Sequence, residues 1–442
     1  MIITYIYFAA YALVLGLITW RATRRQTAEE FLNSGKTLTA SQSAWTTFAS
    51  LLTGYNFVLG VTFSFLYGFW YLFAFIGAGA AFGALYLFYK KELLSLQGQH
   101  NLFSIGDYFG LRYGQFSKHL TNVIFCLGLV LFLTLQISVN TTLFSSLFGI
   151  SQELALLFTV GTVGIYLWLG GFKASVATDV FQGILMLPII LVIFSFPVSF
   201  AWEKIPTAFD PSQFWFAIGL ALLQFFSLAA QPESFQRVFA AKDSQALKKG
   251  LIYSFTMLAA VAGAIAYLGI NFRFAGINGD PSTLFVAGVL PVLPAWLASL
   301  LSVSLVAAFM GTMDSSAFAL GTLLSRKRTE PTKKAVQEVR YLMLGGVVVS
   351  GLASLYLFSF LASFFALISL VSVVGAALVL TLLYEKTTTL EINTFLLVGT
   401  IVFIFGLVFK FVTDNPLTSL IPSGAGLVAF LVIHLWYLYR KI

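Results

Sequence analysis

The chain has 442 residues, of which 59% are hydrophobic and only 10% charged, and it carries a net charge of +8 at pH 7. Soluble domains contain about 25% charged residues, so this composition excludes a soluble protein that covers its core with a polar surface. The single cysteine, Cys126, excludes an internal disulfide and a cysteine-based metal site.

Apolar stretches of about 20 residues follow one another along almost the whole chain, and each is long enough to cross a bilayer as a helix. A transmembrane β-barrel is excluded, because its strands are about 10 residues long and alternate in polarity. We therefore expect an all-α polytopic membrane protein with about thirteen spans. In chain order they are residues 2–20, 44–62, 64–89, 120–149, 152–171, 174–200, 213–231, 250–275, 295–325, 339–358, 360–384, 391–412 and 420–439.

The positive charge could indicate nucleic acid or anionic substrates, but its distribution favours a membrane topology. If the N-terminus is outside and the C-terminus cytoplasmic, all 25 Lys and Arg residues except Lys204, Arg273 and Lys410 fall in or beside cytoplasmic segments. This is the positive-inside pattern. Two of the cytoplasmic segments, 102–114 and 233–250, have apolar residues at helical spacing. We expect them to form helices along the inner surface.

The second and seventh spans carry helix breakers in their middle. The second contains Thr53-Gly54-Tyr55-Asn56 and the seventh contains Gln231-Pro232. Backbone that is broken at membrane depth must line a cavity or be buried in protein. The two interruptions lie five spans apart, which predicts an inverted repeat of five plus five helices with a binding site at the broken helices.

A single membrane transport domain over residues 1–442 follows from this pattern. Residues 1–43 would hold the first span and a cytoplasmic loop, 44–200 the first repeat, 213–384 the second repeat and 391–442 two peripheral spans. The alternative is that Gly and Pro are simply common in membrane helices.

The ninth span contains a carboxylate, Asp314, in a long apolar run. A charge at the centre of a membrane helix costs about 2.5–3.5 kcal/mol on insertion scales, so it suggests a function. Ala308, Gly311, Thr312 and Ser315 share one helical face. Their oxygens are suited to a small hard cation. A second candidate is Asp179, near the start of the sixth span. The structural alternatives are a hydrogen bond to a neighbouring helix for Asp314 and an interaction with the helix dipole for Asp179.

Five segments resemble the sodium:solute symporter family, in family order and at family spacing. The segment "GGFKASVATDVFQG" (170–183) resembles the family's Gly-Gly and Thr-Asp-x-x-Gln signature, and "AAFMGTMDSS" (307–316) its hydroxyl-bearing helix. The others are "TAEEFLNSGKTL" (27–38), "FASLLTGYNFVLG" (48–60) and "QPESFQRVFAAKD" (231–243), and the last is similar to the proline-transporter branch. The resemblance implies a leucine-transporter-type core and alternating access coupled to sodium.

The resemblance also implies two ion sites. The first would use the carbonyls of Ala49, Leu52 and Ala308 and the hydroxyl of Thr312. The family's other hydroxyl falls on Gly311, which has none, so a proton remains open as the coupling ion. The second site, present in some members, would use Asp179, Asp314 and Ser315, and two neighbouring carboxylates favour a cation or a shared proton.

The solute is expected between the two interruptions, at positions that match or adjoin those of the family. These are Thr53, Tyr55 and Asn56 on one side, and Gln224, Ser227 and Gln231 on the other. We expect a small organic solute, an amino acid such as proline, imported across a bacterial-type inner (plasma) membrane. A carboxylate or sugar transporter, a solute sensor and an intramembrane enzyme stay as alternatives. Apart from solute, sodium and lipid, neither nucleic acid nor an obligatory protein partner is expected.

Overall fold

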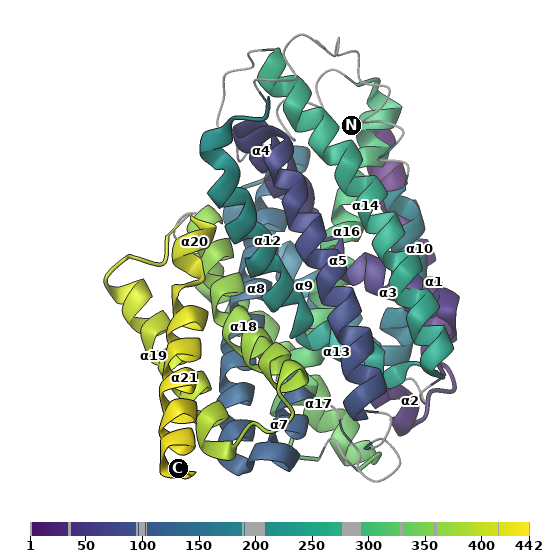
Figure 1. Ribbon diagram of the computed structural model, residues 1–442. Coiled ribbons are helices and arrows are strands. Elements are labelled where there is room, and N and C mark those ends of the chain that lie inside the picture. Colours follow the sequence, from purple (N-terminus) through teal and green to yellow (C-terminus); the bar gives the residue numbers. More distant parts are fainter. Residues whose placement is uncertain are drawn as a thin grey trace. The chain divides into compact units, whose positions relative to one another are not determined.

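The computed structural model describes residues 2–33, 37–93, 104–187, 208–275, 293–327, 330–356, 360–413 and 415–441, together with residues 96, 102 and 190. This part of the chain consists of helices and their connections, with an isolated β-bridge between Leu38 and Ala241 (Figure 1). The all-α class predicted from the sequence is confirmed.

The helices before residue 190 are α1 (Ile2–Thr23), α2 (Ala28–Asn33), α3 (Ala40–Leu51), α4 (Gly54–Tyr67), η2 (Gly68–Leu72), α5 (Phe73–Phe88), η3 (Tyr89–Leu93), α7 (Ile105–Tyr113), α8 (Gln115–Phe148), α9 (Gln152–Leu169) and α10 (Phe172–Met186). Those after residue 207 are η5 (Pro211–Gln213), α12 (Phe214–Ala229), α13 (Pro232–Ala240), α14 (Ser244–Phe274), α16 (Ala295–Leu324), α17 (Lys333–Ser354), α18 (Phe360–Leu383), α19 (Thr389–Val408), α20 (Pro416–Ser419) and α21 (Ile421–Lys441).

Ten helical segments of the described residues are long and apolar enough to cross a membrane. The predicted number of thirteen spans and the five-plus-five repeat stay predictions. Most expected boundaries agree with the helices within a few residues, but the third span begins later than expected. Residues 64–67 still belong to α4, and a 3₁₀ turn from Gly68 to Leu72 precedes α5. The second half of the span predicted at 174–200 lies outside the described residues.

Both predicted interruptions are present. Between α3 and α4, Thr53 is extended, with φ −83° and ψ 157°, and its hydroxyl accepts a hydrogen bond from the backbone nitrogen of Asn56 at 3.2 Å. Thr53 therefore caps α4. The Asn56 side chain donates to the Leu51 carbonyl at 2.6 Å, so it satisfies a carbonyl at the end of α3. The second interruption separates α12 from α13, which begins at Pro232, and proline is favoured in the first helical turn.

The prediction of a surface helix over 233–250 is wrong. The segment is divided between α13 and α14, and Glu233, Phe235 and Arg237 in α13 are 1%, 1% and 2% exposed. The pattern of alternating polar and apolar residues is real, but protein surrounds the polar face as well. The Arg237 guanidinium, for example, donates to the Glu233 carbonyl at 2.9 Å. The helix expected over 102–114 is present as α7, but Tyr108 and Phe109 are 1% and 0% exposed.

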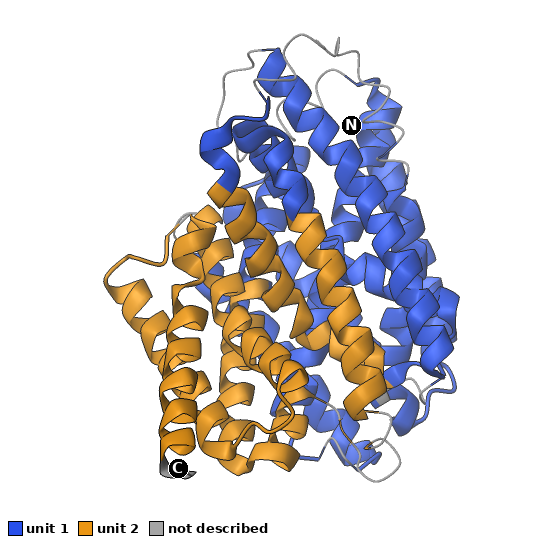
Figure 2. Ribbon diagram, in the orientation of Figure 1, with its two compact units in different colours: residues 1–73, 133–214, 240–357 blue, residues 74–132, 215–239, 358–442 orange. Residues whose placement is uncertain are grey.

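The chain divides into two compact units, each built from three stretches of sequence (Figure 2). Unit 1 comprises residues 1–73, 133–214 and 240–357, and unit 2 comprises residues 74–132, 215–239 and 358–442. In unit 2, α12 packs closely against two helices. A Cβ atom on Gly77 of α5 would lie 2.0 Å from the Ala221 carbonyl oxygen, and one on Gly375 of α18 would lie 1.7 Å from that of Phe226. Only glycine allows these approaches.

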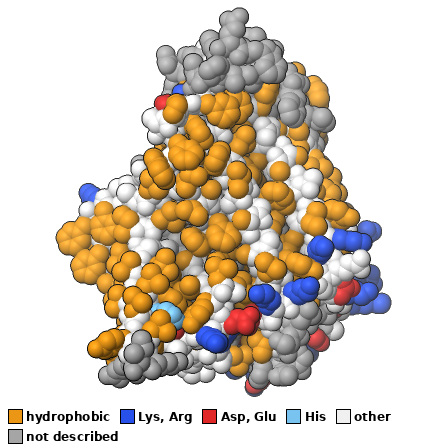
Figure 3. Space-filling model, in the orientation of Figure 1, with side chains coloured by type: hydrophobic (Ala, Val, Ile, Leu, Met, Phe, Trp, Pro, Cys, Tyr) orange, Lys and Arg blue, Asp and Glu red, His pale blue; other side chains and the backbone are white. Residues whose placement is uncertain are grey.

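Hydrophobic side chains cover most of the face that Figure 3 shows, and Lys and Arg side chains gather in the part that holds α2. Large apolar side chains are mostly exposed on several helices, such as Leu13 (65% exposed) on α1 and Leu157 (70%) on α9. A soluble protein rarely exposes an apolar surface of this extent. The surface therefore agrees with a protein whose solvent is the bilayer.

An ion pair outside the spans ties α2 to the start of α10. The Lys173 ammonium lies 2.5 Å from the Glu30 carboxylate, and this hydrogen bond holds the pKa of Glu30 below its ordinary value of 4.5. Because the pKa is lowered on folding, the pair stabilises the protein above pH 4.5 and this contribution is lost as the pH falls through the folded value. Both side chains are partly exposed, so the contribution is at most about 1 kcal/mol.

We expect Glu30→Gln to lower the melting temperature of the purified protein slightly at pH 7, and we expect the difference from wild type to shrink at pH 3. Thermal unfolding of both proteins across this range checks the sign. A difference that grows on acidification contradicts the role of the ion pair.

Candidate functional site

Helix α16 is surrounded by protein, and every residue from Leu301 to Leu323 is buried. Its hydroxyls donate to backbone carbonyls one turn earlier along the same helix, at 2.8–3.0 Å. The donors are Ser302, Ser304, Thr312, Ser315 and Thr322. These bonds satisfy the hydroxyl hydrogens, so the oxygens keep lone pairs that can accept from, or bind, a group on a neighbouring helix.

Two of the four predicted ligands of the first ion site are direct neighbours. The Thr312 hydroxyl lies 2.8 Å from the Ala308 carbonyl oxygen, and both residues are 0% exposed. The other two, Ala49 and Leu52, lie at the end of α3, which packs against α16. Leu52 leaves the helical conformation, with φ −84° and ψ 82°. The Leu52 carbonyl therefore lies outside the regular α-helix.

The interruption approaches α16 closely. A Cβ atom on Gly54, the first residue of α4, would lie 2.4 Å from the Phe309 ring. A side chain at this position would displace either the ring or the broken backbone. Glycine thus allows the backbone at the interruption between α3 and α4 to pack directly against α16.

Asp179 lies on α10, which packs against both α3 and α16. The carboxylate is 0% exposed and accepts a hydrogen bond from the hydroxyl of Thr46, one turn before Ala49 on α3. A small residue, Gly183, allows the two helices to come together, because a Cβ atom there would lie 2.9 Å from the Trp45 ring. Asp179 is therefore a buried carboxyl group beside the broken helix.

Gln182 occupies the place of the hydroxyl that Gly311 lacks. A Cβ atom on Gly311 would lie 2.6 Å from Gln182 Oε1 and 3.5 Å from Asp179 Oδ1, so both oxygens face this point on α16. The Gln182 amide nitrogen donates to the Tyr11 hydroxyl at 3.0 Å, which fixes the oxygen on the side of Gly311. No hydrogen bond to Oε1 occurs within the described residues. Two acceptor oxygens that face the same point are suited to a bound cation or a shared proton.

Asp314 has a separate set of partners. The Tyr166 hydroxyl donates to Asp314 Oδ2 at 2.9 Å, and the Ser315 hydroxyl lies 3.3 Å from Oδ1. The Tyr166 oxygen also contacts the hydroxyl of Thr178, the residue before Asp179. The hydroxyl of Tyr166 on α9 therefore joins Asp314 of α16 to Thr178 of α10, the residue next to Asp179.

Carbonyl, hydroxyl, amide and carboxylate oxygens are ligands for hard cations. Within the described residues, no group of three or more His, Cys, Asp and Glu side chains could hold a metal ion. The buried oxygens of α3, α10 and α16 therefore fit an alkali cation better than zinc or another transition metal.

The residues predicted to hold the solute are divided between the units. In unit 1, Thr53 caps α4 and Asn56 binds the Leu51 carbonyl, whereas the side chain of Tyr55 lies outside the described part of the structure. In unit 2, the Ser227 hydroxyl donates to the Gln224 carbonyl at 3.3 Å, and Gln231 lies in the break before α13. Their assignment to one solute site stays a prediction.

Four residues that contact Asp179, Asp314 or the surroundings of Gly311 were not identified from the sequence. They are Thr46, Tyr166, Tyr11 and Gln182. Gln182 stands in the quoted Thr-Asp-x-x-Gln signature, so the motif already contained a signal for it. The other three belong to helices that are distant in sequence from their partners. No local pattern indicates such pairings.

A profile of the family described as "Sodium:solute symporter family" matches residues 31–391, which is most of the chain. The chain belongs to the sodium:solute symporter family. The sodium/pantothenate symporter of Haemophilus influenzae is 29% identical over 357 residues, covering 74% of this chain and 72% of the relative. The sodium/proline symporter of Salmonella typhimurium is 24% identical over 386 residues, covering 79% and 74%.

Among solved structures, that of a substrate-bound, outward-open Na⁺-coupled sialic acid symporter is similar with a TM-score of 0.78 at 16% identity, covering 97% of this chain and 96% of that chain. At this identity the likeness establishes the shared fold. The family, the transporter fold and the integral membrane location that the sequence predicted are confirmed. This symporter-family member is a transporter and not an enzyme, and its family supports sodium as an ion that it binds.

Proposed function

We propose that this protein imports a small carboxylate-bearing solute, such as proline or a related amino acid, together with sodium by alternating access. The observation that supports the proposal is the packing of α3, α10 and α16 around the buried Asp179, whose carboxylate accepts from Thr46 of α3 and faces Gly311 of α16. The ion would bind the carbonyls of Ala49, Leu52 and Ala308 and the hydroxyl of Thr312, with the Asp179 carboxylate beside them. Such a site would hold α3 against α16.

The second set of oxygens, at Asp314 and Ser315, would bind a further cation or hold a proton. Tyr166 supports this role because its hydroxyl contacts both Asp314 and Thr178. A hydroxyl that bonds a buried carboxyl group can reorient when that group binds an ion or a proton. Sodium entry across 100 mV releases about 2.3 kcal/mol per charge, which supports roughly 50-fold accumulation of a neutral solute.

The chemistry of the solute is inferred from the helix ends and the relatives. Helices α4 and α13 both begin at an interruption, and helix N-termini favour anionic groups. In broken-helix transporters such ends point at the substrate carboxylate. Proline, pantothenate and sialic acid, the solutes in the names of the similar proteins, all carry a carboxylate. Thr53, Tyr55, Asn56, Gln224, Ser227 and Gln231 would contact the rest of the solute.

Uptake into proteoliposomes tests the proposal. Purified protein is reconstituted, an inward sodium or proton gradient is imposed, and labelled proline, pantothenate, sialic acid and a hexose are supplied separately. We expect one of the three carboxylates to accumulate only with sodium outside. Accumulation driven by the proton gradient alone contradicts sodium coupling, and accumulation of the hexose contradicts the solute class.

The Thr312 hydroxyl is expected to contribute directly to ion affinity. Replacing Thr312 by alanine removes one oxygen ligand without opening a large cavity, so the dissociation constant for sodium should rise about tenfold, the equivalent of one buried hydrogen bond. Sodium-dependent thermal stabilisation of the purified protein measures this without knowledge of the solute.

Thr322→Ala is the matched control, because Thr322 is also buried on α16 and also donates to a carbonyl one turn earlier. Its sodium affinity should equal that of the wild type. Equal effects of the two substitutions would show that the hydroxyl of Thr312 is structural.

A further inference from the structure

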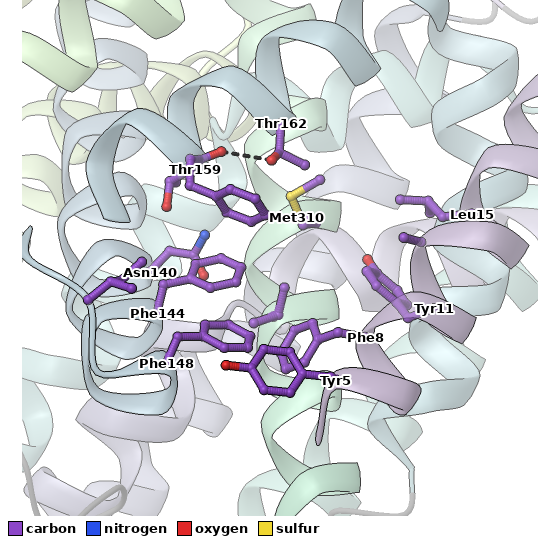
Figure 4. A pocket seen from close by; sticks show the side chains of 14 residues that line it. Tyr5, Phe8, Tyr11, Leu15, Asn140, Phe144, Phe148, Thr159, Thr162 and Met310 are labelled. Atoms are coloured by element: carbon purple, nitrogen blue, oxygen red, sulfur yellow. Dashed lines mark hydrogen bonds between the residues drawn. The ribbon is translucent and has the colours of Figure 1, made fainter. Parts of the chain in front are cut away.

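A cavity of about 400 Å³ lies within unit 1, and none of the residues that line it belongs to α3 or α4. Figure 4 shows that its wall is formed by side chains of α1 on one side and of α8 and α9 on the other, with Met310 of α16 between them. The lining is almost entirely apolar and rich in aromatic rings, among them Phe144 and Phe148, whose centroids are 5.5 Å apart. Its volume lies within the range of about 300–1,000 Å³ that is usual for small-molecule sites.

Asn140 of α8 lines this cavity and is 0% exposed. Neither its side-chain nitrogen nor its oxygen makes a hydrogen bond to a described residue. Thr159 of α9, 1% exposed, also lines the cavity, and its hydroxyl likewise has no partner there. By contrast, the hydroxyl of Thr162, one turn further along α9, donates to the Phe158 carbonyl at 2.7 Å. Buried amides are normally hydrogen-bonded, because an unpaired one is costly.

The cavity reaches the surface of unit 1 between exposed apolar side chains. Tyr5 of α1 is 52% exposed and Phe158 of α9 is 54% exposed, and both also line the cavity. Leu154 and Leu157 next to Phe158 are 53% and 70% exposed. A surface of this kind faces acyl chains in a membrane protein. A ligand can therefore enter from the bilayer.

We propose that this cavity binds a single-chain lipid whose neutral head group both donates and accepts hydrogen bonds. A hydrocarbon chain gains little by moving from the bilayer into an apolar cavity, because lipid tails are as apolar as leucine. Selectivity must then come from the polar end. Asn140 presents one acceptor and two donor hydrogens, and Thr159 presents one of each. A primary amide or an alcohol satisfies both groups, whereas an ester carbonyl can only accept.

The ligand in this cavity also contacts Tyr11, whose hydroxyl accepts the hydrogen bond that orients Gln182. The lipid site and the oxygens near Gly311 thus share one side chain. Binding of the lipid does not depend on the proposed transport activity, and its test involves neither sodium nor uptake.

The test uses the full-length protein in nanodiscs and a stearamide probe that carries a photoreactive diazirine on its chain. Cross-linked residues are mapped by mass spectrometry. Unlabelled oleamide, oleyl alcohol, methyl oleate and octadecene then compete with the probe. We expect cross-links at Phe144, Phe148 or Met310, and we expect oleamide and oleyl alcohol to compete at concentrations about tenfold lower than methyl oleate, with octadecene weakest.

Asn140→Leu should abolish this preference, while the melting temperature stays the same or rises, because the variant removes an unpaired buried amide. Thr159→Val should weaken the preference and Thr162→Val should leave it unchanged, since the Thr162 hydroxyl is already bonded. Equal competition by all four compounds, or cross-links elsewhere only, would overturn the proposal. A marked loss of stability in Asn140→Leu would overturn it as well, because Asn140 would then have a structural role.

Discussion

Replacing Asp179 by asparagine is expected to weaken sodium binding about 100-fold, the equivalent of about 2.7 kcal/mol. Asparagine has nearly the same shape, and its Oδ1 can still accept the hydrogen bond from Thr46. The substitution therefore removes the charge and leaves the packing between α3 and α10. A carboxylate at membrane depth costs about 2.5–3.5 kcal/mol on insertion scales, and binding a cation offsets this cost. Without sodium, Asp179→Asn should be at least as stable as the wild type.

Sodium-dependent thermal stabilisation and the sodium dependence of uptake both measure the effect. The control is Asp243→Asn. Asp243 caps α14 by accepting a hydrogen bond from the backbone nitrogen of Ala246 at 2.7 Å, and asparagine caps helices equally well. This variant should bind sodium like the wild type. An unchanged sodium dependence in Asp179→Asn would place the ion elsewhere.

The second large effect is expected at Gly311. In Gly311→Ser the new Cβ atom would lie 2.6 Å from Gln182 Oε1, a distance that real side chains do not adopt. The amide end of Gln182 must move, and we expect this displacement to break its hydrogen bond to Tyr11. Overpacking of this kind costs about 1–3 kcal/mol of stability, and sodium affinity should fall with it because the amide oxygen leaves the site.

The double variant Gly311→Ser with Gln182→Ala separates packing from ligand chemistry. The serine hydroxyl then takes the place of the amide oxygen, so stability and sodium affinity should both recover relative to Gly311→Ser alone. Gly263→Ser controls for the glycine substitution, since nothing lies within 4 Å of a Cβ atom there. If the double variant is no better than the single one, Gln182 and Gly311 do not share a site.

The interruptions of the second and seventh spans could be predicted because their signals are local. Thr53, Gly54 and Asn56 form a helix cap within four residues, and Pro232 marks the start of α13 directly. The beginning of α14 was placed six residues late, at 250 instead of Ser244. The prediction followed hydropathy and therefore marked where the apolar stretch begins. The helix itself begins earlier, directly after its N-cap residue Asp243.

The candidate site could be predicted only in part. The residues on α16 follow from the spacing along one helix, and the family resemblance added Ala49 and Leu52 on α3. The contacts of Thr46 with Asp179 and of Gln182 with Tyr11 join positions that are 133 and 171 residues apart. They depend on how α1, α3 and α10 pack, which no motif encodes. The same holds for the burial of α13, because an amphipathic pattern does not distinguish water from a polar protein interior.

The hydroxyl groups of α16 determine which sign of charge this helix can accept. The hydroxyls of Ser302, Ser304, Thr312, Ser315 and Thr322 each donate to a carbonyl one turn earlier on the same helix. The lone pairs of such an oxygen are then turned outward, towards the neighbouring helices. Towards its neighbours, these hydroxyl groups of α16 therefore act as hydrogen-bond acceptors and not as donors. An anion would find no donor among these groups, whereas a dehydrated cation meets acceptors that need no reorientation before it binds.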